Sequence, residues 1–488
     1  MKSQSMRAMV RYSPSPARRL RRKPLKPETI RNQAMHSTES ASDEQRAAYF
    51  AVAACLCGIL LSGCALYHPR PLQEASPADA ATLAQTVQDS NKPLLSPLPI
   101  PPDGPWNDLQ LADIAIVASP DLRALRAQEQ VAGAQVFAAG LLPDPGIGIS
   151  ADRPDGSGAV NAYSLSAGLD LAALLTRHSR IAAAQANAEQ VRRDIAWQEW
   201  LAANQVRLLA RRYQFLERQH AVAARAADAA EKLLALTQAA VDQHNARLDD
   251  LALRRIAVLD ARSREGQLAR DVEAARLQLN QAVGVTPDTR LPLADAAALH
   301  DPSTLDVAAL EKQALDKRLD LAALRAGYAA QEAAVRGAIL QQYPLPTITL
   351  SRARDTTPIY TKGASLSFSL PLWNRNRGGI AVAKATREQL HAEYAARVFD
   401  AQSAIAAQVE ALKQIAAQRK ELDTQLDQLR AELQPLEHAA ERRDVGLVTF
   451  ETARATLLDK EIASLALAQA QSEGEVALAI NVGELIWK

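Results

Sequence analysis

Apolar residues alternate with small polar ones in two stretches of the chain, 163–171 (YSLSAGLDL) and 364–372 (ASLSFSLPL). Shorter alternations precede them at 147–150 and 347–351. A period of two predicts β-strands, so the sequence predicts two strand pairs. Their apolar face is formed by Tyr163, Leu165, Leu169, Leu366, Phe368 and Leu370. Two interpretations stay open here: a hairpin resting on a soluble core, or the wall of a membrane barrel with lipid outside and water inside.

A different spacing follows the first strand pair. No glycine or proline occurs between Leu169 and Glu265, and apolar residues recur every three to four positions. They include Val191, Ile195, Ala202, Val206, Leu209, Tyr213 and Leu216. This narrow seam is typical of long coiled-coil-like helices. The polar segment 242–250 (DQHNARLDD) predicts a reversal, which makes the first arm roughly 100 Å long at about 1.5 Å per residue.

The chain contains two copies of the same sequence unit. The segment 120–127 (PDLRALRA) returns as 319–326 (LDLAALRA), and Val283-Gly284 returns as Val482-Gly483 in the same register. Such long-range self-similarity indicates a tandem duplication. We therefore predict two repeats, 106–284 and 285–488, each containing a helix, two strands and two further helices.

Four strands are too few to close a membrane barrel, because the smallest barrels have eight. Open sheet edges in lipid would leave backbone groups without hydrogen-bond partners. If these strands span a membrane, several chains must share one barrel. Two copies would supply eight strands and three copies twelve, and these arguments do not choose between them.

All three cysteines lie near the start of the chain, at Cys55, Cys57 and Cys64. The uncharged run 47–61 is too short for a spanning helix and fits the apolar core of a signal peptide, predicted over 1–63. Its end, Leu61-Ser62-Gly63-Cys64, resembles a lipobox, which implies that Cys64 is the lipid-bearing first residue of the mature chain. The alternatives are a buried helix carrying all three thiols, or a Cys-x-Cys metal pair.

The segment 64–105 contains nine prolines and is predicted to be an extended tether behind the lipid anchor. The signal segment contains eleven basic and four acidic residues, so the mature part has 45 bases and 51 acids. Although the basic stretch 18–23 could be a nucleic-acid patch, a mildly acidic body argues against nucleic acid as the partner. No cofactor is predicted beyond the covalent lipid on Cys64.

Several segments, taken in order, resemble the outer-membrane efflux lipoproteins of the TolC family. They are the lipobox, 138–145 (AAGLLPDP), 365–379 (SLSFSLPLWNRNRGG), 444–459 (DVGLVTFETARATLLD), and the endings LNQAVG and LAINVG of the repeats. The resemblance covers the chain from Cys64 to Lys488. It implies a mainly α-helical homotrimer whose twelve strands form one barrel in the outer membrane of a Gram-negative bacterium. Twelve long helices would form a periplasmic tunnel, which meets a periplasmic adaptor protein and an inner-membrane pump.

The resemblance also assigns roles to the helix turns at 245–249 and 445–449, which correspond to the family's periplasmic tips. Gly446 suits a tight reversal there because glycine tolerates a positive φ, whereas the first repeat has Arg247 at that place, so the two turns are expected to differ. The predicted tip and docking residues are Arg247, Leu248, Asp249, Gly446, Leu447, Val448 and Thr449. The family's gating aspartates correspond to Leu253, Thr452 and Ala455 in this chain. Nearby carboxylates that could substitute are Asp249, Asp250 and Glu451, with a solvated helix face as the alternative.

The segment 371–378 (PLWNRNRG) most resembles the heavy-metal-export branch and would turn the chain at the barrel rim, with Trp373 at the membrane interface. The eight histidines are scattered, and no metal site is predicted.

Three other functions make different demands on the sequence. A lipidated periplasmic adaptor needs one helical hairpin flanked by β-rich domains, not two hairpins. An enzyme is not expected, because the chain lacks Gly-x-Ser-x-Gly, Walker and His-Glu-x-x-His motifs. A structural lipoprotein that braces the envelope would differ from a conduit in passing no current.

Overall fold

The computed structural model describes residues 67–72, 95, 100–101, 104–155, 158, 160–357, 359–442 and 446–487. The chain divides into two units, 1–75 and 76–488, and the architecture below is that of the second. The signal peptide, Cys64 and most of the proposed tether lie outside the described residues.

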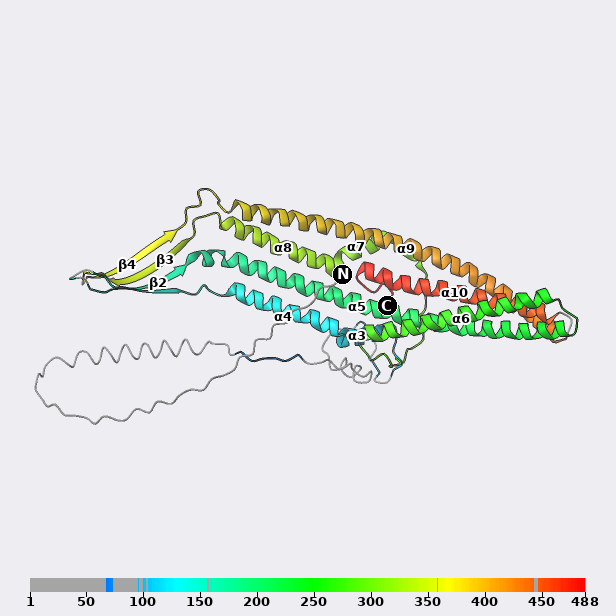
Figure 1. Ribbon diagram of the computed structural model, residues 1–488. Helices are drawn as coiled ribbons and strands as arrows, with labels where there is room; N and C mark the ends of the chain where they lie inside the picture. Colours follow the sequence, from blue (N-terminus) through cyan, green and yellow to red (C-terminus); the bar gives the residue numbers. More distant parts are fainter. Residues whose placement is uncertain are drawn as a thin grey trace, which may run out of the picture. The chain divides into compact units, whose positions relative to one another are not determined.

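Each half of this unit contains two shorter helices, two strands and two long helices (Figure 1). The first half consists of α3 (Asp108–Ala118), α4 (Pro120–Gly140), β1 (Gly146–Asp152), β2 (Ala162–Asp170), α5 (Leu171–Asp242) and α6 (Leu248–Val283). After the 3-10 turn η1 (Pro302–Thr304), the second half consists of α7 (Val307–Lys317), α8 (Leu319–Leu340), β3 (Pro346–Arg354), β4 (Tyr360–Phe368), α9 (Arg377–Glu441) and α10 (Leu447–Val482). The predicted order is present in both halves. Each half also begins with one short helix that was not predicted, α3 in the first and α7 in the second.

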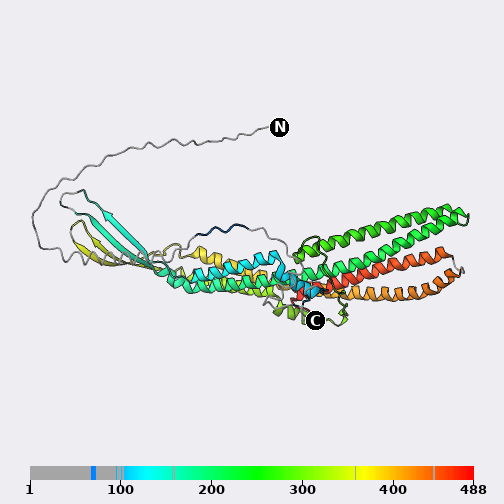
Figure 2. The ribbon, with the colours of Figure 1, turned by 90° about the horizontal axis from the view of Figure 1, so that it is seen from below.

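The helix α5 has 72 residues, or about 108 Å at 1.5 Å per residue. Asp170 caps its start by accepting a hydrogen bond from the Ala172 amide at 2.8 Å. The chain reverses after Asp242, as the polar segment predicted, and α6 begins at Leu248. The reversals α5–α6 and α9–α10 lie at the end of the unit opposite the strands (Figures 1 and 2).

Small and aliphatic residues fill the helical core. Around α5, Trp106 and Leu111 of the first half pack with Val206, Leu279 and Val283. The second half has a matching cluster where α7 meets α9 and α10, formed by Leu310, Ala314, Ile405, Val409, Leu412, Leu478 and Val482. The short helices thus cover corresponding positions on the long helices of each repeat. Among the described residues, none of the helices combines the length and the apolar content that a membrane crossing requires.

The four strands form one antiparallel sheet in the order β1-β2-β3-β4. Two predicted strand ends are wrong. β2 ends at Asp170, because its side chain caps α5 and Leu171 joins that helix. β4 ends at Phe368, so Leu370 lies in the connection to α9; Pro371 directly after it has no amide hydrogen for a strand ladder.

Candidate functional site

The sheet has one apolar and one hydroxyl-rich face. The register pairs Ile149 with Leu165, and Leu350 with Ala167 and Ala364. Its apolar face carries Ile147, Ile149, Tyr163, Leu165, Leu169, Ile348, Leu350, Leu366 and Phe368. The opposite face carries Ser150, Ser164, Ser166, Thr347, Thr349, Ser351, Thr361, Ser365 and Ser367, interspersed with glycines.

Within the described part of the chain, no core covers the apolar face. Ile149 is 81% exposed, Leu350 60% and Leu366 59%. The hypothesis of a hairpin resting on a soluble core therefore fails, because such a core would bury these side chains. An exposed apolar face of this size needs another medium or another molecule to cover it.

The sheet is also open at both edges. In the order β1-β2-β3-β4, the outer edges of β1 and β4 have no strand partner among the described residues. Unpaired edge groups invite pairing with further strands. The sheet therefore has the edges needed to join copies of itself.

The connection from β4 to α9 is fixed by local backbone geometry. Arg375 and Asn376 have positive φ values of 44° and 51°. The Asn376 side-chain amide donates to the Ala338 carbonyl at 2.8 Å, which ties the connection to α8. Trp373 is 85% exposed just ahead of this anchor.

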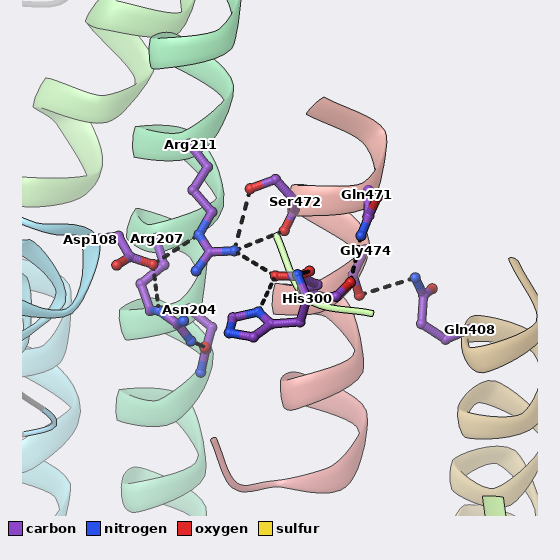
Figure 3. A network of polar contacts seen from close by, with 10 residues as sticks. Asp108, Asn204, Arg207, Arg211, His300, Gln408, Gln471, Ser472 and Gly474 are labelled. Carbon is purple, nitrogen blue, oxygen red and sulfur yellow. Dashed lines mark hydrogen bonds and ion pairs between the residues drawn. The ribbon is translucent and has the colours of Figure 1, made fainter. Parts of the chain in front are cut away.

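A buried polar network joins the two halves near the middle of the helical region (Figure 3). Asp108 accepts hydrogen bonds from Arg207 Nε at 3.1 Å and Arg211 Nε at 2.9 Å. Arg211 Nη1 reaches across to the Ser472 carbonyl at 3.2 Å and to Glu475 Oε2 at 3.4 Å. Burial lowers the pKa of Arg207, while the charge of Asp108 acts in the opposite direction. Three elements are thereby linked: the start of α3, α5 and α10.

The segment between the halves joins the same network. The His300 amide donates to Glu475 Oε1 at 2.8 Å, and the His300 ring lies against Trp487 with centroids 5.0 Å apart. Gln471 Nε2 donates to the His300 carbonyl at 2.7 Å. Sequence reasoning missed this network. The available signal was the pair Arg207 and Arg211, spaced four residues apart within an apolar helix face.

The predicted tip residues lie at and just after the two reversals. Arg247 and Gly446 are the residues before α6 and α10, with φ values of −92° and −63°. Gly446 does not use the positive φ that glycine tolerates, because both residues adopt extended geometry before a helix. In the first reversal, His244 has the left-handed conformation, with φ of 62°. Leu248, Asp249, Leu447, Val448 and Thr449 lie in the first turns of the helices that follow.

The candidate gate carboxylates have different surroundings. Asp249 accepts a hydrogen bond from Arg247 Nε at 3.0 Å, and both it and Asp250 are exposed. Glu451 is only 7% exposed, and its Oε2 has no hydrogen-bond partner among the described residues. Asp249 and Asp250 thus belong to an exposed tip, whereas Glu451 is packed inside the protomer. In the described part of the chain, no cluster of three or more His, Cys, Asp or Glu could hold a metal ion.

The fold of this chain is similar to that of several solved outer-membrane channels. A structure of CusC, described in terms of folding and transmembrane channel formation, matches with a TM-score of 0.65 at 16% identity, covering 85% of this chain and 99% of that one. The Campylobacter jejuni CmeC outer-membrane channel matches with 0.64 at 13% identity, covering 87% and 96%. The open Neisseria gonorrhoeae MtrE channel matches with 0.62 at 18% identity, covering 77% and 89%.

No family model matches the sequence, and no curated protein does. The structural likeness establishes the fold: a mainly helical, TolC-like tandem repeat with a small antiparallel sheet, shared with outer-membrane channels.

Proposed function

We propose that the protein is the outer-membrane channel of a tripartite efflux system, a passive conduit that changes no bond in its cargo. The main support for this proposal is the sheet, which has an exposed apolar face, a hydroxyl-rich opposite face and two edges without strand partners among the described residues. Lipid would cover the first face and water the second. The long helices, of which α5 measures about 108 Å, would continue the conduit into the periplasm.

Three copies would close a twelve-stranded barrel and remove every open edge. The fold shared with CusC, CmeC and MtrE supports this number over two. An inner-membrane pump and an adaptor would act at the helix tips, where Leu248 is 74% exposed. The two-hairpin fold counts against the protein itself being an adaptor. Metal ions and drugs are both candidate cargo, and selection would belong to the pump.

Planar-bilayer recording tests the conduit directly. The purified, detergent-solubilised protein is expected to insert and give discrete conductance steps, while heat-denatured protein gives none. A structural lipoprotein that only supports the envelope would pass no current. A folded preparation that shows no conductance would therefore contradict the proposal. A susceptibility panel of metals and drugs on a deletion strain would then identify the cargo.

We infer a lipid anchor at Cys64 from the lipobox alone. The Cys64→Ala variant should lose palmitate labelling and remain unprocessed, and unchanged labelling would refute the anchor. This result is independent of conductance, since the barrel needs no lipid to close.

A further inference from the structure

A group of cationic side chains continues the apolar sheet face toward the β3–β4 loop. The register pairs Arg352 with Leu165 and Lys362, and it pairs Arg354 with Tyr360. Directly paired residues lie on the same face of a sheet. Arg352, Arg354 and Lys362, here called the cationic patch, therefore share the face that is apolar nearer the helices.

The chain itself does not neutralise this patch. The two strand aspartates, Asp152 and Asp170, lie on the hydroxyl-rich face. Asp355, next to Arg354, accepts a hydrogen bond from the Thr356 amide in the loop instead. Within the described part of the chain, no carboxylate forms an ion pair with any patch residue.

The Arg354 side chain lies over an aromatic ring, and one of its donor atoms lacks a hydrogen-bond partner among the described residues. Its guanidinium carbon lies 5.8 Å from the centroid of the Tyr360 ring. Its Nε is buried and has no hydrogen-bond partner among the described residues. The patch therefore presents positive charge to whatever covers this face.

The patch lies at the loop end of the apolar face, the part of that face nearest a membrane interface. Arg354 follows Leu350 by four residues, about 13 Å along the strand, and Arg352 follows it by two, about 7 Å. Charges on the lipid face of a barrel are costly at the bilayer centre and nearly free at its interfaces. Tyr360, 66% exposed, and Tyr163, 50% exposed, lie at the same level, where aromatic belts form.

We propose that the cationic patch binds the phosphate groups of an anionic glycolipid in the outer leaflet. The inference rests on the proposed function, because it needs the sheet to span the outer membrane. Two arginines suit the bidentate recognition of phosphate oxygens. A lipid is the favoured source of phosphate, because Leu350 and Leu366 continue the face where its acyl chains would lie.

Native mass spectrometry of the full-length protein tests this, with synthetic hexa-acyl lipid A carrying two phosphates or none as probes. The wild type should retain the bisphosphorylated form preferentially. The variant R352Q/R354Q/K362Q should retain at least about tenfold less of it, since each basic group near a lipid surface contributes roughly fivefold. The control K232Q/K384Q/K460Q removes three exposed helical charges and should retain as much as the wild type. The variant R352K/R354K keeps the positive charge but loses the guanidinium fork, so it should retain less than the wild type and more than the triple glutamine variant.

Equal retention of both probes by the wild type would overturn the inference, and so would undiminished retention by the triple variant. If that variant does not assemble, the salt dependence of lipid retention by the wild type tests the inference. Its retention of the bisphosphorylated probe should fall when NaCl rises from about 0.05 to about 0.5 M, while the phosphate-free probe is unaffected. Conductance of the same preparation separates the two proposals. A conducting protein without phosphate preference refutes this one alone, and a folded, silent protein refutes the proposed function.

Discussion

At the residue scale, the end of α10 depends on a glycine. Gly483 has a φ of 82°, and an added Cβ would lie 3.0 Å from Arg318 Cα and 3.2 Å from Arg318 N. Arg318 cannot retreat easily, because Arg318 Nη1 donates to the Asn481 carbonyl at 2.8 Å. We expect Gly483→Ala to lower the free energy of unfolding by about 1–3 kcal/mol, measured by thermal circular dichroism in detergent.

Gly446 is the matched control for that substitution. With a φ of −63°, an added Cβ would meet nothing closer than Thr449 Oγ1 at 3.9 Å. Gly446→Ala should therefore change the free energy of unfolding by less than about 0.5 kcal/mol. Equal losses in both variants would show that backbone conformation does not decide the cost.

One ion pair makes stability depend on pH. Arg212 donates two hydrogen bonds of 2.8 Å to Glu473, which links α5 to α10. Burial alone would raise the pKa of Glu473, but the hydrogen bonds from Arg212 and Gln469 and the charge of Arg212 outweigh it, so the pKa is lowered. The folded state thus binds the proton less readily than the unfolded state. The pair's stabilisation is complete above the ordinary carboxyl pKa and is lost as pH falls through the lowered value.

Glu473→Gln should remove this contribution. The pair is partly exposed, so we expect a loss of about 1 kcal/mol at neutral pH. The difference in Tm between wild type and variant should shrink as pH falls from about 7 to about 3. A constant difference across that range would assign the loss to packing rather than to charge.

At the element scale, local patterns predicted most of the architecture. Period-two alternation found all four strands, and the polar segment after α5 located the helix reversal. The short helices α3 and α7 were missed, although Asn107 and Gln110 form a capping box at the start of α3. Long-range contacts were beyond local patterns: Arg211 meets Ser472 across 261 positions. The cationic patch likewise appears only when the strand register places Arg352 beside Leu165.

The two sheet faces should respond oppositely to a charge. Leu350→Asp places a carboxylate on the face proposed to meet lipid, near the centre of the apolar band. We expect a membrane-assembly defect of about 1–2 kcal/mol, seen as loss of heat-resistant oligomer in outer-membrane fractions. The neighbouring Ser351→Asp points to the hydroxyl-rich face and should assemble normally. Equal behaviour of the two variants would contradict the assignment of faces.

At the scale of the whole molecule, a buried polar network joins the two halves at the centre. The network around Asp108, Arg211 and Glu475 fixes the repeats to each other through buried charge pairs. The sheet at one end has outer edges without a strand partner among the described residues. β1 and β4 lie at the two outer edges of this sheet, so assembly should close through these edges.

Edge closure can be tested by disulfides that cannot form within one chain. Ile149 on β1 and Leu366 on β4 share the apolar face, but three strand spacings, about 14 Å, and a further offset of four residues along the strand separate them. A disulfide needs Cα atoms within about 7 Å. Cysteines at both positions, with the β1 site also moved to Ile147 or Ala151 to sample register, should therefore cross-link only between subunits. We expect oxidised gels to show dimers and trimers and nothing larger, because a closed ring ends the series. Single-cysteine variants should stay monomeric, and a ladder beyond three would mean that the edges join without closing.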